Sequence, residues 1–165
     1  MKVETSSVRT AGLLSLFDLH TMYYVRALDG ISDQDAHNRL NTEANHMAWL
    51  AGSAIYGRIQ MTSETHPGQQ MSGHELFQDM RGIQAQATYP TLAEYRRDWE
   101  RITPLARQAL IGLDDAKLNS EMDMGFMKMS YYELLVFTIY REANLIGQLA
   151  LWRRLLGYPA LKYDE

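Results

Sequence analysis

Four long stretches of helical periodicity constrain the fold of this 165-residue chain more than any other feature of its sequence. In each stretch the apolar residues recur every three or four positions, which is the pattern of a helix with one face against a core. The stretches lie at 8–28, 45–60, 91–112 and 130–156. No alternating strand pattern competes with them, although 122–129 is a short candidate for extended chain. The chain is therefore predicted to be all-α.

Capping residues and glycines indicate where these helices begin and end. Asn45 is the predicted N-cap of the second helix. Residues 91–94 (Thr-Leu-Ala-Glu) and 130–133 (Ser-Tyr-Tyr-Glu) each carry a hydroxyl residue followed three positions later by glutamate, which is typical of a capping box. Gly30 and Gly157 follow the first and fourth helices, and glycine accepts the left-handed backbone at a helix C-terminus.

The link between the second and third helices sets the expected topology. A bundle whose neighbouring helices alternate in direction uses short loops, whereas residues 61–90 form a long connection. Such a connection can cross the bundle and let the second and third helices run parallel, and a short extra helix is expected within it at 74–81. Since no internal repeat or flexible linker divides the chain, residues 1–165 are predicted to form a single four-helix-bundle domain.

Composition narrows the classes of function. Hydrophobic residues make up 46% of the chain and charged residues 22%, which are values typical of a globular domain. Cysteine is absent, which excludes disulfides, thiolate metal ligands and a cysteine nucleophile. The net charge of −4 disfavours a nucleic-acid partner, because non-specific nucleic-acid binding needs a concentrated basic surface. With no apolar run near the length of a membrane span and no secretory signal pattern at the start, a cytoplasmic protein without a membrane partner is expected.

Two motifs resemble a known family. Residues 140–149 read Tyr-Arg-Glu-Ala-Asn-Leu-Ile-Gly-Gln-Leu, with Arg-Arg-Leu-Leu-Gly following at 153–157, and residues 45–53 read Asn-His-Met-Ala-Trp-Leu-Ala-Gly-Ser. Both resemble helices of the DinB/YfiT-like superfamily. The resemblance implies an up-down-down-up four-helix bundle with a long crossover between helices 2 and 3. Members often bind a divalent metal through one histidine on the second helix and two on the fourth, and some are metal-dependent enzymes that use low-molecular-weight thiols.

Carried onto this chain, the resemblance places the family's metal-ligand positions on Ser53, Arg141 and Leu145. Leucine has no ligand atom, and arginine stays protonated and offers no lone pair to a metal. A small shift of the alignment brings in His46 instead of Ser53, which still leaves one histidine where a catalytic zinc typically needs three protein ligands. The resemblance therefore implies a degenerate metal site, and no metal or other cofactor is expected.

Polar and aromatic side chains at helical spacing predict a pocket around these positions. The candidate ligand-binding residues are Arg141, Ser53, His46, Leu145, Gln148, Tyr56, His20 and Thr138. They lie on three of the predicted helices, whose stripes are expected to converge in the centre of the bundle. No catalytic residue is assigned among them.

Arg141 has two interpretations, because a buried unpaired charge is costly and needs a compensating group. In one, Arg141 anchors the acid group of a small molecule, with Ser53 and either His46 or His20 adding hydrogen bonds. In the other, Arg141 is structural and pairs with a carboxylate of the chain. The carboxylates considered for that pair are Glu142, Asp18 and Asp123.

Three functions are compatible with these features. The first is a metal-free DinB-like protein that binds a small molecule or a partner without catalysis. The alternative is a metal- or thiol-cofactor-dependent transferase or hydrolase of the DinB/YfiT type. The third is a dimerisation module, which is compatible with the first; a homodimer is expected because related bundles often pair through helix faces.

Overall fold

Four long helices dominate the computed structural model, which describes residues 4–164. They are α1 (Val8–Leu28), α3 (Met47–Met61), α4 (Leu92–Gly112) and α6 (Tyr131–Leu155). Shorter elements are α2 (Asp33–Ala36), η1 (His74–Leu76), η2 (Gln78–Met80), α5 (Asp115–Leu118), β1 (Glu121–Asp123) and β2 (Lys128–Ser130). The all-α prediction is confirmed at this coarse level. The first residues of the chain, on which the expectation about a secretory signal partly rested, lie outside the described range.

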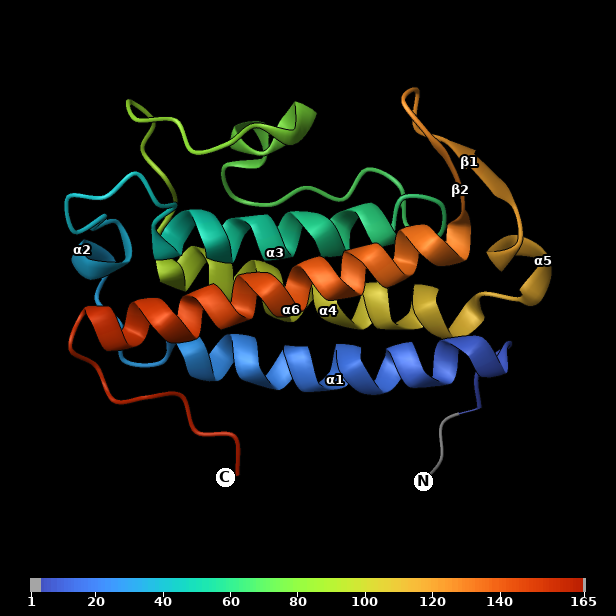
Figure 1. Ribbon diagram of the computed structural model, residues 1–165, viewed down its shortest axis with the longest axis horizontal. Coiled ribbons are helices and arrows are strands. Elements are labelled where there is room, and N and C mark those ends of the chain that lie inside the picture. Colours follow the sequence, from blue (N-terminus) through green and yellow to red (C-terminus); the bar gives the residue numbers. More distant parts are fainter. Residues whose placement is uncertain (1–3, 165) are drawn as a thin grey trace.

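The four long helices lie side by side and run in two opposite directions (Figure 1). Helices α1 and α6 run one way, and α3 and α4 run the other way. Helix α1 packs against α6 and α4, and α3 packs against the same two helices. Residues 62–91 return along α3 to its starting end before α4 begins, as expected for a long crossover (Figure 1).

The predicted capping boxes are both present. Thr91 caps α4 and Ser130 caps α6, each with the glutamate three residues on bonding back to the cap. The predicted N-cap of α3 is wrong, because His46 and not Asn45 has that role. The Nδ1 atom of His46 accepts a hydrogen bond from the Trp49 backbone N–H at 3.0 Å, so α3 begins at Met47.

One short segment, 74–81, differs from the expected helix, and another, around 122–129, is extended as expected. The segment 74–81 forms two short 3₁₀ turns separated at Phe77, and the backbone at Asp79 in the second turn is left-handed, with φ 56°. Residues 121–130 form an antiparallel hairpin in which Glu121 pairs with Ser130 and Gly125 turns the chain.

The core consists of two apolar clusters with a polar layer between them. One cluster surrounds Trp99 and Ile55, and the other surrounds Phe17 and Leu110. At the level between the clusters, each long helix contributes a polar side chain. These are Thr21 and His20 from α1, Arg58 from α3, Thr103 from α4 and Glu142 from α6.

Candidate functional site

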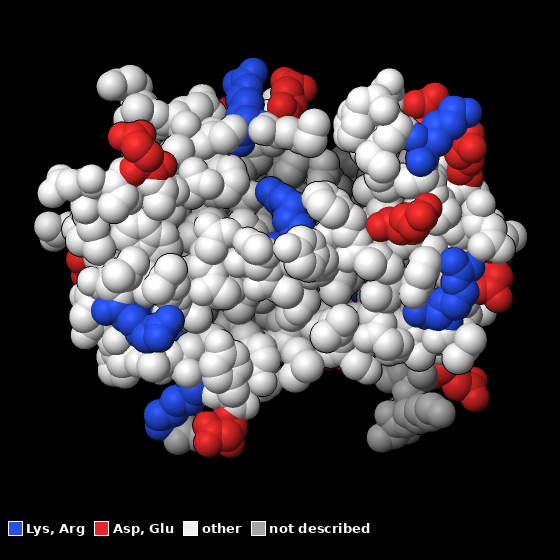
Figure 2. Space-filling view, in the orientation of Figure 1, with Lys and Arg blue, Asp and Glu red and all other residues white. Residues whose placement is uncertain are grey.

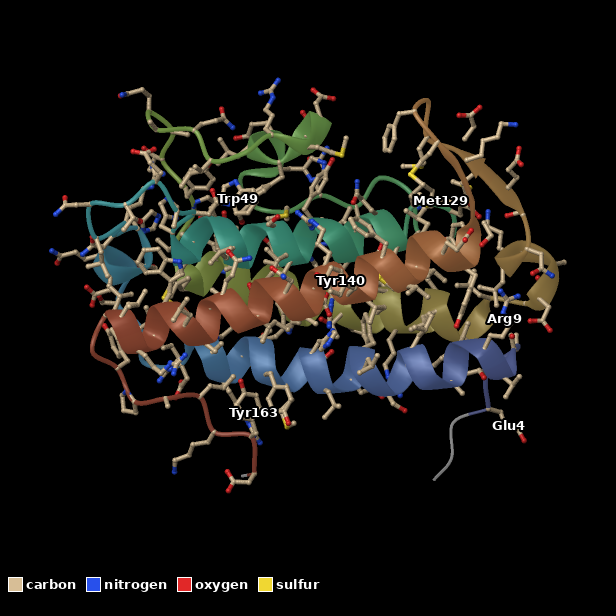
Figure 3. The ribbon with its side chains drawn as sticks, in the orientation of Figure 1. Glu4, Arg9, Trp49, Met129, Tyr140 and Tyr163 are labelled. Atoms are coloured by element: carbon tan, nitrogen blue, oxygen red, sulfur yellow. The ribbon has the colours of Figure 1, made fainter. Side chains whose placement is uncertain are left out.

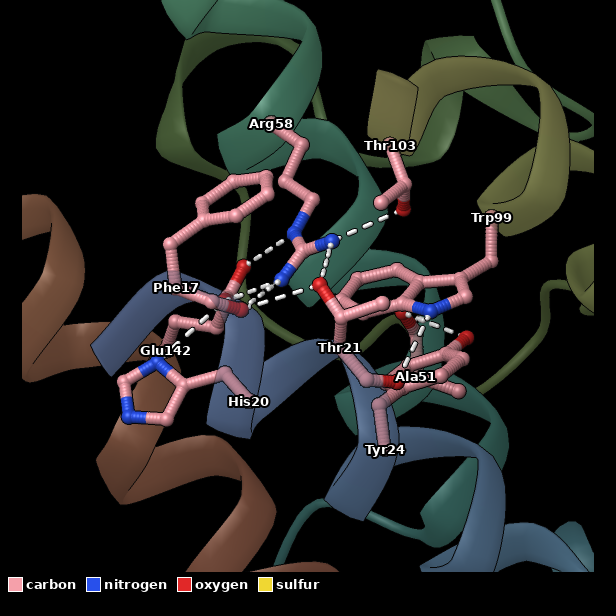
Figure 4. A network of polar contacts seen from close by, with 9 residues as sticks. All are labelled: Phe17, His20, Thr21, Tyr24, Ala51, Arg58, Trp99, Thr103 and Glu142. Carbon is pink, nitrogen blue, oxygen red and sulfur yellow. Dashed lines mark hydrogen bonds and ion pairs between the residues drawn. The ribbon is translucent and has the colours of Figure 1, made fainter. Parts of the chain in front are cut away.

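Arg58 is the centre of the polar layer and is fully buried, with 0% of its surface exposed (Figure 4). Its Nε and Nη2 atoms donate to the two carboxylate oxygens of Glu142, each at 2.8 Å. Nη1 donates to Thr21 Oγ1 at 2.9 Å and Thr103 Oγ1 at 2.7 Å. Nη2 also donates to the Phe17 carbonyl at 3.3 Å. All five N–H groups of the guanidinium are therefore used, which is what a buried arginine requires.

Aromatic rings complete the surroundings of Arg58. Its guanidinium carbon lies 3.8 Å from the centre of the Phe17 ring and 3.6 Å from that of Trp99, within the range of cation–π contacts. The only charged residue of α3 is thus neutralised, fully hydrogen-bonded and stacked. Since no N–H group remains free, Arg58 is a structural residue and offers nothing to a ligand.

Glu142 remains ionised in this layer. Burial raises its pKa, but the Arg58 charge and the hydrogen bonds from Arg58 and His20 outweigh burial and hold the pKa below its ordinary value. His20 Nδ1 lies 3.2 Å from Glu142 Oε1. This contact commits the imidazole to the polar layer.

Arg141 precedes Glu142 on α6 and has a contrasting environment. It is half-buried between α6 and α3, and its Nη2 donates to Ser53 Oγ at 2.7 Å. The position that a Cβ atom would take at Gly57 lies 3.8 Å from Nη1, so the guanidinium also lies over Gly57 of α3 at ordinary contact distance. Desolvation lowers the pKa of Arg141. Figure 2 shows a basic side chain over the junction of α3 and α6 with uncharged residues around it.

Of the two interpretations of Arg141, the structure does not show the one in which it pairs with a carboxylate of the described chain. Glu142 binds Arg58, Asp18 binds Arg107, and Asp123 accepts a hydrogen bond from a backbone N–H in the hairpin. Within residues 4–164, Arg141 has a single hydrogen-bond partner, the neutral Ser53 hydroxyl, and no ion pair. Its charge is therefore uncompensated by the described part of the chain.

The other candidates on α6 and α3 take different positions. Leu145 is buried one turn along α6 from Arg141. Thr138 is half-buried and donates to the Leu134 carbonyl of its own helix, while Gln148 is exposed and bonds to Asn144. Tyr56 packs against the crossover and lines a small hollow of about 190 Å³ together with His66 and His74.

The two candidate histidines are occupied elsewhere, since His20 contacts Glu142 and His46 caps α3. Neither is hydrogen-bonded to Arg141. Burial, and then the neighbouring His37, lower the pKa of His46 to about 4, so its ring is neutral and can accept the capping hydrogen bond. The structure therefore brings Arg141 and Ser53 together, and it separates both histidines from them.

A divalent metal does not fit the family's ligand positions in this chain. To hold a metal, the side chains at these positions would have to face one ion with lone pairs. Instead, the guanidinium of Arg141 donates a hydrogen bond to Ser53, and Leu145 presents only carbon. Across the described range, no three histidine, aspartate or glutamate side chains are grouped so that they could hold an ion elsewhere. The donors present favour an anion over a cation at this position.

A larger hollow, of about 440 Å³, lies away from these residues between the end of α1 and the start of α4. Leu28, Ile31 and Leu92 contribute apolar surface to it, and Arg96 and Arg97 lie at its side. None of the predicted site residues lines it.

Arg58 and Phe77 escaped the sequence reasoning. The signal for Arg58 was available, because it is the one charged residue in an otherwise uncharged helix. Phe77 is buried at 3% exposure although it lies in the crossover, and it sits against Gly52 of α3.

Comparisons with known proteins assign no family: no protein-family model matches the chain, and no curated protein sequence matches it. The resemblance to the DinB/YfiT-like superfamily thus rests on the two motifs at 45–53 and 140–157. In the part of the chain that the structure describes, no helix is long and apolar enough to cross a membrane.

The polar layer predicts a large effect of Glu142→Gln on stability. Breaking one partner of a buried ion pair should lower the free energy of unfolding by about 3–5 kcal/mol, because Arg58 is left charged and unneutralised. Asp18→Asn is the matched control, since it breaks the exposed pair with Arg107 and should cost less than about 1 kcal/mol. Urea denaturation of both variants measures the difference, and equal small losses would contradict a structural role for the layer.

Proposed function

We propose that this protein is a cytoplasmic, non-catalytic member of the DinB-like four-helix bundles, with the up-down-down-up order, that binds a small anionic ligand between α3 and α6. Arg141 anchors the ligand at the position where the family's metal would lie. The observation that carries the proposal is the half-buried Arg141 guanidinium, whose one hydrogen-bond partner in the described chain is a neutral hydroxyl.

The unused hydrogen-bonding capacity of Arg141 defines the ligand chemistry. One of its five N–H groups donates to Ser53, which leaves the others available. A guanidinium fork matches the two oxygens of a carboxylate or phosphate, and hydrogen bonds between two charged groups are stronger than neutral ones. Ser53 Oγ accepts from Arg141, so its own hydrogen is free to donate to the same anion.

The comparison with Arg58 strengthens this assignment. The two arginines face the same bundle from α3 and α6, and both are at least partly removed from water. Arg58 has a carboxylate, two hydroxyls, a carbonyl and two rings, whereas Arg141 has Ser53. The chain compensates the buried charge of Arg58 completely but leaves that of Arg141 uncompensated. An external anion bound at Arg141 supplies the missing negative charge.

Titration with acetate and inorganic phosphate tests the proposal. Both anions should bind the wild-type chain weakly, and Arg141→Ala should weaken binding by about 10–100-fold, the loss expected for a hydrogen bond to a charged group. Arg154→Ala, an exposed arginine of the same helix, is the control and should leave binding unchanged. Isothermal titration calorimetry at low salt measures the affinities.

Equal binding by wild type and Arg141→Ala would contradict the proposal. Near-stoichiometric zinc or nickel in chelator-free protein would favour the enzymatic alternative instead.

We also propose that the protein is a homodimer that pairs through an apolar face of α1 and α6. This α1/α6 face is defined by Leu16, Leu19, Val136, Tyr140 and Leu151, which are between 41% and 63% exposed. The packed pair α1 and α6 presents them toward solvent, and Tyr140 is labelled on α6 in Figure 3. None of the five is charged, so a second copy can lie on the same face without like-charge repulsion. The α6 part runs over 16 residues, from Val136 to Leu151, about 22 Å, which suits a helix-to-helix contact.

Sedimentation equilibrium tests the homodimer. The wild-type chain should sediment as a dimer at micromolar concentration, and Tyr140→Glu should shift it to a monomer because it buries a charge in the apolar contact. Met80→Glu, at an 86% exposed position outside the face, should stay dimeric. A monomeric wild type, or a dimer that tolerates Tyr140→Glu, would exclude the α1/α6 face.

A further inference from the structure

The Phe77 ring lies in a slot against α3, and a glycine and three aromatic residues surround it. A Cβ atom at position 52 would lie 2.3 Å from Phe77 Cζ and 2.7 Å from Tyr95 OH, so only glycine allows the ring to reach the helix there. Trp49 and Tyr56, one turn before and after Gly52, have ring centres 6.2 Å from that of Phe77. Tyr89 closes the fourth side at 6.0 Å. The slot therefore has the width and lining of a site for one aromatic ring.

Polar atoms around this slot lack hydrogen-bond partners. In the described chain, three buried side-chain polar atoms have none: Trp49 Nε1, Tyr95 OH and His74 Nδ1. Tyr95 is fully buried and Trp49 is 8% exposed, and both lie against Phe77 or Gly52. Buried polar groups are nearly always paired in folded proteins. The phenylalanine ring cannot pair them, because it has no polar atom.

The segment that carries Phe77 is weakly attached. Hydrogen bonds and ion pairs of residues 74–83 remain within the crossover, and none of those described joins them to α1, α3, α4 or α6. The backbone at Asp79 and Met80 is left-handed, a conformation that is unfavourable for residues other than glycine. Phe77 is the one fully inserted side chain of 74–83, with Leu76 and Ile83 half-buried beside it. The ring can thus leave the slot without breaking a hydrogen bond to the helices.

We propose that the Phe77 slot is the ring subsite of the ligand pocket, and that Phe77 plugs it until a ligand ring replaces it. The ligand class is a monocyclic aromatic acid whose ring bears a hydrogen-bonding substituent such as a hydroxyl. The substituent pairs Trp49 Nε1 and Tyr95 OH, and the acid group reaches Arg141. The second half rests on the proposed function. Tyr56, whose ring lies beside Phe77, is one turn along α3 from Ser53, which bonds to Arg141, so the two subsites adjoin along the helix.

Phenol tests the ring subsite independently of Arg141, because it has the ring and the hydroxyl but no acid group. Phe77→Ala removes the plug and should bind phenol about tenfold more tightly than wild type, since the closed state no longer competes. Phe126→Ala, at an exposed phenylalanine of the hairpin, is the control and should bind phenol as wild type does. Trp49→Phe in the Phe77→Ala background should reduce the preference for phenol over toluene, because Tyr95 OH is then the one remaining partner of the phenol hydroxyl in the slot. Equal phenol affinity in wild type and Phe77→Ala would overturn the proposal.

Hydrogen exchange on the wild-type chain tests the plug without a variant that must fold. Saturating 4-hydroxybenzoate should raise amide exchange in 74–83, whereas acetate, which fills the anion subsite alone, should not. Unchanged exchange in 74–83 at saturation would overturn displacement of Phe77.

The two proposals fail separately. If Phe77→Ala changes phenol binding but Arg141→Ala leaves acetate binding unchanged, the ring subsite is supported and the anion anchor is excluded. The reverse pattern keeps the anchor and removes the ring subsite.

Discussion

The ion pair of Arg58 with Glu142 is the interaction on which the rest of the structure depends. It joins α3 to α6, and the same guanidinium bonds to hydroxyls on α1 and α4, so one side chain connects all four long helices. Apolar packing on either side is non-directional and tolerates sliding, whereas a guanidinium with five placed acceptors does not. The polar layer therefore fixes the register of the helices relative to one another. Replacing all residues of the polar layer by apolar ones can preserve the stability of the bundle, but it would remove this constraint on the register of the helices.

Two consecutive residues of α6 have contrasting environments. Glu142 faces the layer and is fully satisfied, while Arg141 faces α3 and has a single neutral partner. Because the layer holds α3 and α6 at a fixed separation, it also positions Ser53 and Arg141 at hydrogen-bond distance. A rigid pair of helices with one uncompensated cation is a suitable scaffold for an anion, since the guanidinium is positioned before the ligand arrives. In our proposal, the crossover adds a displaceable wall to the ligand pocket through Phe77.

Local signals in the sequence predicted the helices well, and tertiary contacts decided what the sequence could not show. The capping boxes at Thr91 and Ser130 are read from residues three positions apart, and both are present. The cap of α3 was misplaced by one residue because Asn45 and His46 can both accept a backbone N–H. Packing of the His46 ring near Tyr89 and His37, distant in sequence, accompanies its choice as the cap.

The candidate site was predicted only in part, because local patterns show which residues share a helix face but not which distant residues meet. Ser53 and Arg141 do meet, as the spacing on their helices suggested. The sequence left open whether Arg141 pairs with a carboxylate, and it did not show that Glu142 binds Arg58, because the two are 84 residues apart and no local pattern links them. Phe77 could not be found from periodicity, since it belongs to an irregular segment whose position is set by the glycine it meets.

The most direct test of the central claim compares the two arginines in one experiment. In a ¹⁵N-labelled sample, the side-chain Nε–H signals of Arg58 and Arg141 are followed by NMR during titration with acetate. The Arg141 signal should move and saturate while the Arg58 signal, already bonded to Glu142, should stay fixed. An Arg141 signal that does not respond, or an Arg58 signal that moves with it, would contradict the division between a structural and a ligand-binding arginine.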